Sequence, residues 1–181
     1  MKRAFLAVGL VAIMGSMAAA QSQQPYAGLE QRSIKTLSDQ QIADMQAGRG
    51  MGFALAAELN GYPGPVHAIE LADRLGLSAD QVAMLKQLFE AMKAETIPIG
   101  ANLISQERAL NEDFAQRTVT PASLEATTQQ IGATQASLRA AHLKYHLATT
   151  AILTADQVAQ YNTLRGYAAG SPSPQHNHTH Q

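Results

Sequence analysis

A strict seven-residue repeat is the feature of this sequence that most restricts how the chain can fold. Between residues 121 and 152, large apolar side chains recur at every seventh position: Leu124, Ile131, Leu138, Tyr145 and Ile152. This spacing keeps an apolar seam on one side of a supercoiled helix, so it predicts a helix that packs lengthwise against another helix. The neighbouring seam positions carry small side chains, which permits a close approach of the partner: Thr127, Thr134, Ala141 and Ala148.

The segment before this repeat is the simplest partner. From Ser78, apolar residues follow a helical spacing: Leu85, Leu88, Met92, Ile99, Leu103, Leu110 and Phe114. Such spacing predicts one long helix. Only a short connection at residues 118–121 separates the two helices, so we expect an antiparallel hairpin. Pro98 lies inside the first helix, where it lacks an N–H and its ring clashes with the preceding turn, which predicts a kink or a split near Glu95.

Shorter helices are predicted on both sides of the hairpin. Ser38 can cap a first helix, which then meets Gly48, Gly50 and Gly52, where we expect a bend or a close backbone contact. Further helices are predicted over residues 53–59, 66–75 and 154–165. The fold class is therefore all-α, with a long antiparallel helical hairpin and shorter flanking helices.

The N-terminus has the pattern of a Sec-type signal peptide. Lys2 and Arg3 precede a short apolar run, and Ala18 and Ala20 supply the small residues of an A-x-A cleavage site, so we expect cleavage after Ala20. The run is too short for a membrane anchor, which needs about 20 consecutive apolar residues. We therefore expect a periplasmic protein with no stable membrane anchor. Its expected parts are a signal peptide at 1–20, a flexible segment at 21–36, a helical domain at 37–168 and a disordered tail at 169–181.

Several classes of function are disfavoured by composition and motifs. The chain has no cysteine, so it has neither a disulfide nor a thiol nucleophile. Its formal net charge of −1 argues against nucleic acid as a partner. It has no G-x-S-x-G elbow, no H-E-x-x-H motif and no phosphate-binding glycine loop after a strand, so we do not expect an enzyme.

Two of the capped helix starts carry the same short motif. The copies consist of Leu77, Ser78 and Gln81 before the long helix, and of Leu153, Thr154 and Gln157 before the last one. In each copy the hydroxyl can accept from the backbone N–H of the glutamine, and the glutamine side chain can accept from the backbone N–H of the capping residue. This arrangement is a capping box. A third copy occupies residues 37–41. The paired copies resemble the LTxxQ motifs of the Spy/CpxP family, which includes the metal-linked members ZraP and CnrX.

The resemblance covers roughly residues 37–166 and implies a periplasmic homodimer of helical hairpins. It implies an ATP-independent chaperone of the envelope stress response, which binds unfolded or misfolded envelope proteins, requires no cofactor and works with an envelope-stress or metal-response regulator. The alternative is a heavy-metal sensor or resistance protein that binds divalent Zn, Ni, Co or Cu. A thin hairpin with apolar residues on several faces also cannot bury them all within one chain, which favours a second copy or a bound client.

The candidates for client contact are Met45, Arg49, Met51 and Phe53. Methionine adapts to irregular apolar surfaces, and arginine adds charge and planar stacking. The alternative is that the methionines and the phenylalanine belong to the core, because large apolar side chains are usually buried.

His142 and His146 are the candidate metal ligands with the most informative spacing. Four residues apart, they lie on one face of the helix, as two ligands of one ion must. They fall inside an apolar arc, where neutral imidazoles need hydrogen bonds or a metal. His67 and Glu70, one turn apart, could complete a site for Zn, Ni, Co or Cu. The alternative is that the pair packs at an interface and bonds to carboxylates or backbone groups.

The resemblance implies the same pair, since CnrX-like members bind metal through His and carboxylate groups and His142 and His146 look like their ligands on the second hairpin helix. The chain departs from that pattern in having no clear H-x-x-x-H on the first hairpin helix. The tail carries three more histidines at alternating positions, His176, His178 and His180. They could bind metal weakly or only keep the tail solvated.

Overall fold

The computed structural model describes residues 24–167. The helices in this range are η1 (Leu29–Gln31), α1 (Asp39–Gln46), α2 (Leu55–Glu58), α3 (Pro65–Glu70), α4 (Ala72–Leu75), α5 (Ala79–Gln116), α6 (Pro121–Ile152) and α7 (Ala155–Leu164). The predicted helical fold with a long helix pair is therefore confirmed. None of these helices is long and apolar enough to cross a membrane. The expected signal peptide at 1–20 and the expected tail at 169–181 lie outside the described residues.

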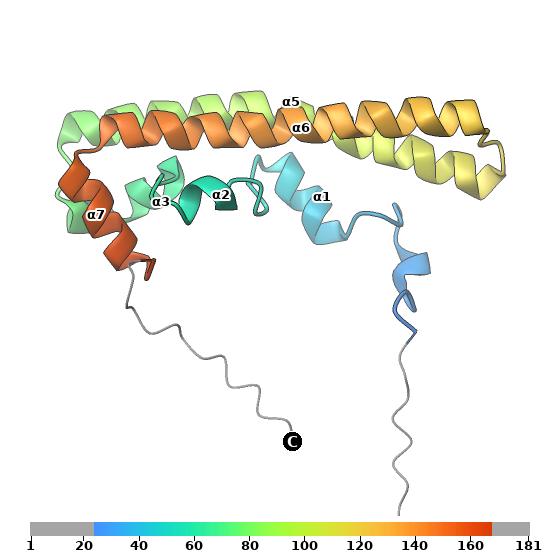
Figure 1. The fold of residues 1–181 in the computed structure, drawn as a ribbon, viewed down its shortest axis with the longest axis horizontal. Coiled ribbons are helices and arrows are strands. Elements are labelled where there is room, and N and C mark those ends of the chain that lie inside the picture. The colour runs from blue at the N-terminus through green and yellow to red at the C-terminus, as the bar shows by residue number, and fades with distance from the viewer. Residues whose placement is uncertain (1–23, 168–181) are drawn as a thin grey trace, which may run out of the picture.

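The hairpin of α5 and α6 forms one layer of the molecule, and the short helices form the other. Figure 1 shows α5 and α6 side by side, with α1, α2 and α3 along one face of the pair. α7 turns down at the end of the hairpin that lies opposite the connection between α5 and α6. The residues between the two layers are therefore contributed by segments far apart in the sequence.

The seven-residue seam faces the interior along the middle of α6. Ile131, Leu138 and Tyr145 are buried, and Ile152 packs against the small cluster around Leu85 of α5. Leu124, next to the hairpin connection, is exposed. In Figure 1, α5 diverges from α6 toward that connection, and Leu124 is 37% exposed there.

Pro98 does not split the first hairpin helix. α5 is continuous from Ala79 to Gln116 with Pro98 inside it, and Figure 1 shows the helix changing direction near its middle. The carbonyl that loses its donor belongs to Ala94, an exposed residue, so water can replace the missing hydrogen bond. The outcome is a bend within one helix.

Glycines bring α1 against the middle of α5, as expected from the glycine-rich stretch. A Cβ atom on Gly48 would lie 3.0 Å from the Thr96 hydroxyl oxygen, and Gly48 also has a φ of +67°. From the other side, a Cβ on Gly100 would lie 3.0 Å from the carbonyl oxygen of Met45. The predicted close backbone contact is confirmed, and α1 ends just before it.

Residues 24–36 differ from the flexible segment that the sequence suggested. They contain η1, and the side chain of Ile34 is fully buried in the main core. Thr36 donates to the Glu107 carboxylate over 2.8 Å, and the backbone N–H of Lys35 donates to Asn111 over 3.3 Å. One buried side chain and a few hydrogen bonds anchor this segment to α5, an arrangement that leaves no periodic pattern in the sequence.

Candidate functional site

The two motif glutamines meet at the open end of the hairpin. Gln81 donates from Nε2 to Oε1 of Gln157 over 2.8 Å, and Gln157 donates back to Oε1 of Gln81 over 3.1 Å. Gln81 also donates to the carbonyl of Ile152 over 2.9 Å. A reciprocal pair of amides therefore joins the starts of α5 and α7, which are 76 residues apart.

Each of these glutamines also completes its own capping box. The hydroxyls of Ser78 and Thr154 accept from the backbone N–H groups of Gln81 and Gln157, and each glutamine Oε1 accepts from the backbone N–H of its cap. The predicted caps are confirmed, but their pairing was not foreseen. Gln41 of the third motif caps α1 in the same way, and its amide has no glutamine opposite it in the described part of the chain.

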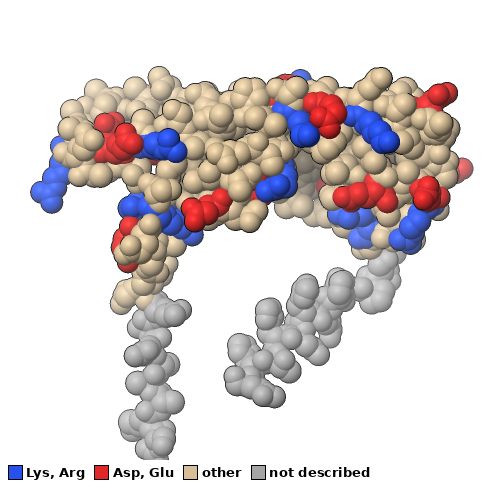
Figure 2. Space-filling view, turned by 180° about the vertical axis from the view of Figure 1, so that it is seen from behind, with Lys and Arg blue, Asp and Glu red and all other residues tan. Residues whose placement is uncertain are grey.

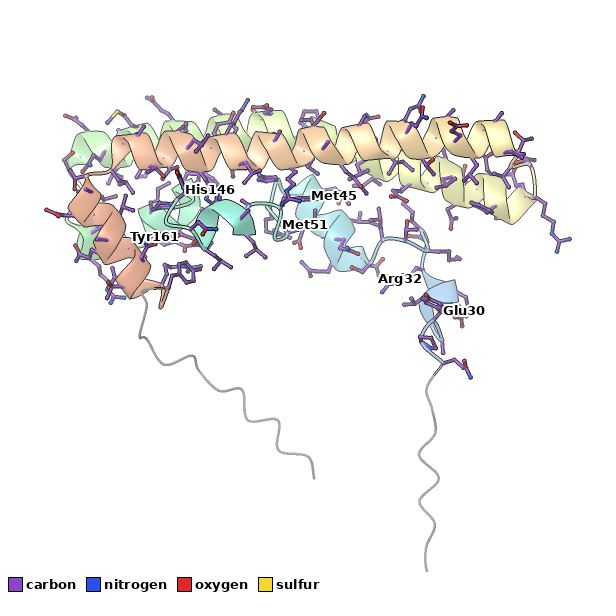
Figure 3. The ribbon with its side chains drawn as sticks, in the orientation of Figure 1. Glu30, Arg32, Met45, Met51, His146 and Tyr161 are labelled. Atoms are coloured by element: carbon purple, nitrogen blue, oxygen red, sulfur yellow. The ribbon has the colours of Figure 1, made fainter. Side chains whose placement is uncertain are left out.

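A single buried carboxylate joins the second layer to the hairpin. Glu58, at the end of α2, accepts at Oε1 from the hydroxyl of Tyr161, and this oxygen lies 3.6 Å from Nε of Arg165. At Oε2 it accepts from the backbone N–H of Gly64 over 3.2 Å and lies 3.7 Å from Nδ1 of His146. α2, α6, α7 and the loop before α3 therefore meet at one side chain, and Figure 3 shows His146 and Tyr161 in the space between them.

Burial raises the pKa of Tyr161 far above its ordinary value, and the hydrogen bond to Glu58 raises it further. The phenol therefore stays protonated and acts as a donor. Since Tyr161 is fully buried and Glu58 is 7% exposed, this bond satisfies a carboxylate that would otherwise be costly to bury.

His146 has a defined orientation. Its Nδ1 lies 2.7 Å from the carbonyl oxygen of Tyr62, which can only accept, so Nδ1 carries the proton. In the neutral ring, Nε2 then keeps a free lone pair. A Cβ on Gly64 would lie 2.9 Å from Cε1 of His146 and 3.2 Å from Nε2, so the ring edge fits only because residue 64 has no side chain.

His142 lies one turn earlier on α6 and is 3% exposed. Its ring stacks on Phe53, with centroids 6.2 Å apart and planes at 18°. Burial lowers the pKa of His142, and the neighbouring His146 lowers it further, so the ring is neutral near pH 7. This environment suits a neutral imidazole, either as a packing residue or as a ligand.

Three of the predicted metal ligands line one cavity. A cavity of about 200 Å³ is bounded by His67, His142 and His146, together with Glu58. Glu70 does not line it. Glu70 lies 3.0 Å from Nδ1 of His67, and both line an adjacent groove of about 730 Å³ between α1, α3 and α5.

The predicted nitrogen and oxygen ligands that the structure describes do not form a complete metal site. Within residues 24–167, no three histidine, cysteine, aspartate or glutamate side chains are grouped closely enough to hold a metal ion. The cavity therefore brings the histidines of α3 and α6 together without closing a coordination shell from these residue types. His176, His178 and His180 lie outside the described residues.

The predicted client-contact residues have different environments. Met45 is 2% exposed and belongs to the core, while Met51 and Phe53 are half-buried against that core. Arg49 is exposed and pairs with Asp44 of α1. A client could therefore reach Met45 only if the second layer moved away from the hairpin.

The large apolar side chains that are more than half exposed lie elsewhere: Leu55, Leu59, Phe114, Leu147 and Tyr26. The sequence pattern did not single out the three leucines, because a leucine in a short helix or on the outer face of α6 looks the same as a core leucine. Phe114 was part of the apolar pattern of the first hairpin helix, but its side chain is 54% exposed near the end of α5. Figure 2 shows the rear face of the molecule as broad uncharged areas between separate groups of charged residues.

The fold and the site define a class of protein: an all-helical hairpin with a layer of short helices joined to it by a buried polar cluster. The chain matches no protein-family model, no curated protein and no solved structure. The likeness to the Spy/CpxP family therefore rests on the motifs and on the hairpin between them.

Proposed function

We propose that this protein is a periplasmic envelope-stress protein of the Spy/CpxP type, which binds unfolded or misfolded envelope proteins as an ATP-independent chaperone. The observation that carries the proposal is the reciprocal amide pair of Gln81 and Gln157. A capping box by itself needs only local contacts. Here the glutamines of two capping boxes, 76 residues apart, also bond to each other. This supports the view that the two copies form one motif with a role in the tertiary structure.

Exposed apolar side chains support client binding. Leu55 of α2 and Leu59, the residue that follows α2, are 53% and 55% exposed, and Leu147 of α6 is 59% exposed. α2 packs against α6, so these side chains lie on neighbouring elements. An apolar surface left open in a monomer is typical of an interaction site, and a homodimer or a client would remove it from water. Signal-peptide cleavage after Ala20 and contact with a stress regulator belong to the same proposal.

Aggregation of a reduced, denatured client tests the chaperone function directly. The purified protein should suppress the light scattering of reduced α-lactalbumin without ATP, and a chelator should not change this. The double substitution Leu55→Ser and Leu59→Ser should weaken suppression, because it removes apolar contact area. Leu124→Ser, at the hairpin connection, is the matched control and should retain it. No suppression at equimolar or higher ratios would reject the chaperone proposal.

A metal sensor or resistance protein is the second candidate, favoured by the convergence of His67, His142 and His146 on one cavity. A Zn, Ni or Co site there would need a further nitrogen or oxygen ligand to move in, because such a set is not grouped in residues 24–167. Calorimetry should find sub-micromolar binding of one of these metals that is lost in the His142→Ala, His146→Ala variant. Binding that persists in this variant would place the site elsewhere.

A further inference from the structure

The cavity beneath α6 has two sulfur-containing residues in its lining. Met51, from the loop between α1 and α2, and Met92, from α5, border it together with His142 and His146. Met92 is 6% exposed. Met51 was a candidate for client contact, and neither residue was a candidate metal ligand in the sequence. Thioether sulfur is a soft donor, which changes the class of metal that the cavity can hold.

The carboxylate at this cavity is already engaged. Glu58 accepts from Tyr161 and Gly64 and lies beside Arg165, so both of its oxygens have partners. His67 pairs with Glu70 through Nδ1, which leaves Nε2 as its remaining ring nitrogen, as in His146. The side chains with donors that line the cavity are therefore the imidazoles, of which His142 and His146 share one face of α6, and the two thioethers.

The loop holds Met51 at the cavity despite backbone strain. Met51 has a φ of +43°, in the left-handed region that a residue with a side chain adopts rarely, and it lies between Gly50 and Gly52. Such strain persists only where surrounding contacts determine the conformation, and it is concentrated at functional sites. Here the contacts include the core against which Met51 packs.

We propose that this cavity binds a single copper(I) ion through the imidazoles of His142 and His146 and the thioethers of Met51 and Met92. The inference rests on the metal-binding candidate function and specifies its metal. Thioether ligands favour copper(I), whereas Zn, Ni and Co are better served by nitrogen, oxygen or thiolate ligands. Burial favours the same ion, because four neutral ligands leave one positive charge in the cavity instead of two.

The test compares copper(I) with zinc on the full chain carrying His176→Asn, His178→Asn and His180→Asn, which removes competing tail ligands. Under anaerobic conditions, with bicinchoninate as the competitor, the protein should take up a single equivalent of copper(I). Met51→Leu and Met92→Leu should each weaken copper(I) affinity by about tenfold or more. Neither should change zinc affinity, since leucine removes the sulfur at nearly constant volume. Met84→Leu, on the exposed side of α5, is the matched control and should change neither affinity.

Copper K-edge absorption of the unsubstituted protein provides a readout that does not depend on variant folding, and it should show sulfur scatterers. A shell of nitrogen and oxygen alone, or copper(I) affinity unchanged in both methionine variants, would overturn the proposal. If the protein binds zinc through His142 and His146 and the methionines have no effect on either metal, the metal-binding function stands and the copper(I) proposal is rejected. Suppression of aggregation is measured separately and reports only on the chaperone function.

Discussion

Gly64 determines how closely the loop before α3 can approach α6. Its φ of −83° is available to any residue, so the requirement for glycine there comes from space and not from backbone conformation. The missing side chain leaves room for the ring edge of His146, and the backbone N–H of the same residue bonds to Glu58. A single position thus supports both the histidine and the carboxylate of the site.

Gly64→Ala should destabilise the protein by about 1–3 kcal/mol, because the added methyl group overlaps the ring of His146. Urea unfolding followed by circular dichroism measures the change. Gly132→Ala is the control: a Cβ there meets nothing within 4 Å, and alanine is better than glycine in a helix by up to about 1 kcal/mol. Equal stability of the two variants would contradict the close contact at Gly64.

Glu95 provides a second residue-level test, through pH. It accepts from Lys144 Nζ over 2.6 Å and from the Tyr145 hydroxyl over 2.8 Å, which lowers the pKa of the Glu95 carboxyl despite the opposing effect of burial. Because the folded pKa is depressed, the unfolded chain binds more protons in acid. The stabilisation is therefore present above the ordinary value of 4.5 and is lost as pH falls through the lower, folded pKa.

Glu95→Gln should accordingly lose less stability than the unsubstituted protein between pH 7 and pH 3, as measured by urea midpoints. Glu90→Gln is the matched control, since within residues 24–167 Glu90 pairs only with Lys93 of its own helix, at 3.4 Å. If the stability of Glu95→Gln falls as steeply with acid as that of the unsubstituted protein, Glu95 does not link α5 to α6 in solution.

At the level of elements, the N-terminal ends of α5 and α7 share a contact in addition to the caps that each helix needs by itself. Ser78 and Thr154 satisfy local backbone donors, which any isolated helix start needs. The amide pair of Gln81 and Gln157 adds a long-range contact that holds α7 against the start of α5. α7 in turn carries Tyr161, so its position affects the bond to Glu58.

A double-mutant cycle on Gln81→Ala and Gln157→Ala should give a coupling energy of about 0.5–1.5 kcal/mol, the typical net contribution of such hydrogen bonds. Each single variant should also lose a capping bond. Gln41→Ala is the control for capping alone, because its box serves only α1. Strict additivity of the two losses would mean that the amide pair adds no stability.

At the level of the whole molecule, the two-layer arrangement leaves apolar surface on both layers. Leu55 and Leu59 belong to the layer that contains the short helices, and Leu147 and Phe114 belong to the hairpin. One chain cannot cover them, because the hairpin is only one helix pair wide and α1 to α3 line one of its faces (Figure 1). A second copy provides the most direct covering under the proposed function.

The purified protein should therefore be an elongated dimer in small-angle scattering and in sedimentation at micromolar concentration. Substituting Leu147→Ser should weaken the dimer if this surface lies in the interface, whereas Lys86→Ser, an exposed polar position of α5, should not. A compact monomer at all concentrations would contradict dimerisation and leave the apolar surface to clients alone.

The sequence by itself determined the local features of this protein. The seven-residue repeat ending at Ile152 and the capping residues Ser78 and Thr154 act over one or two turns, so they predicted the hairpin and the starts of its helices. Only the tertiary structure decided which side chains meet: Gln81 with Gln157, Glu58 with Tyr161, and two methionines with two histidines around one cavity. These contacts join residues far apart in the chain, and their geometry depends on close packing at glycines, which no periodic pattern encodes.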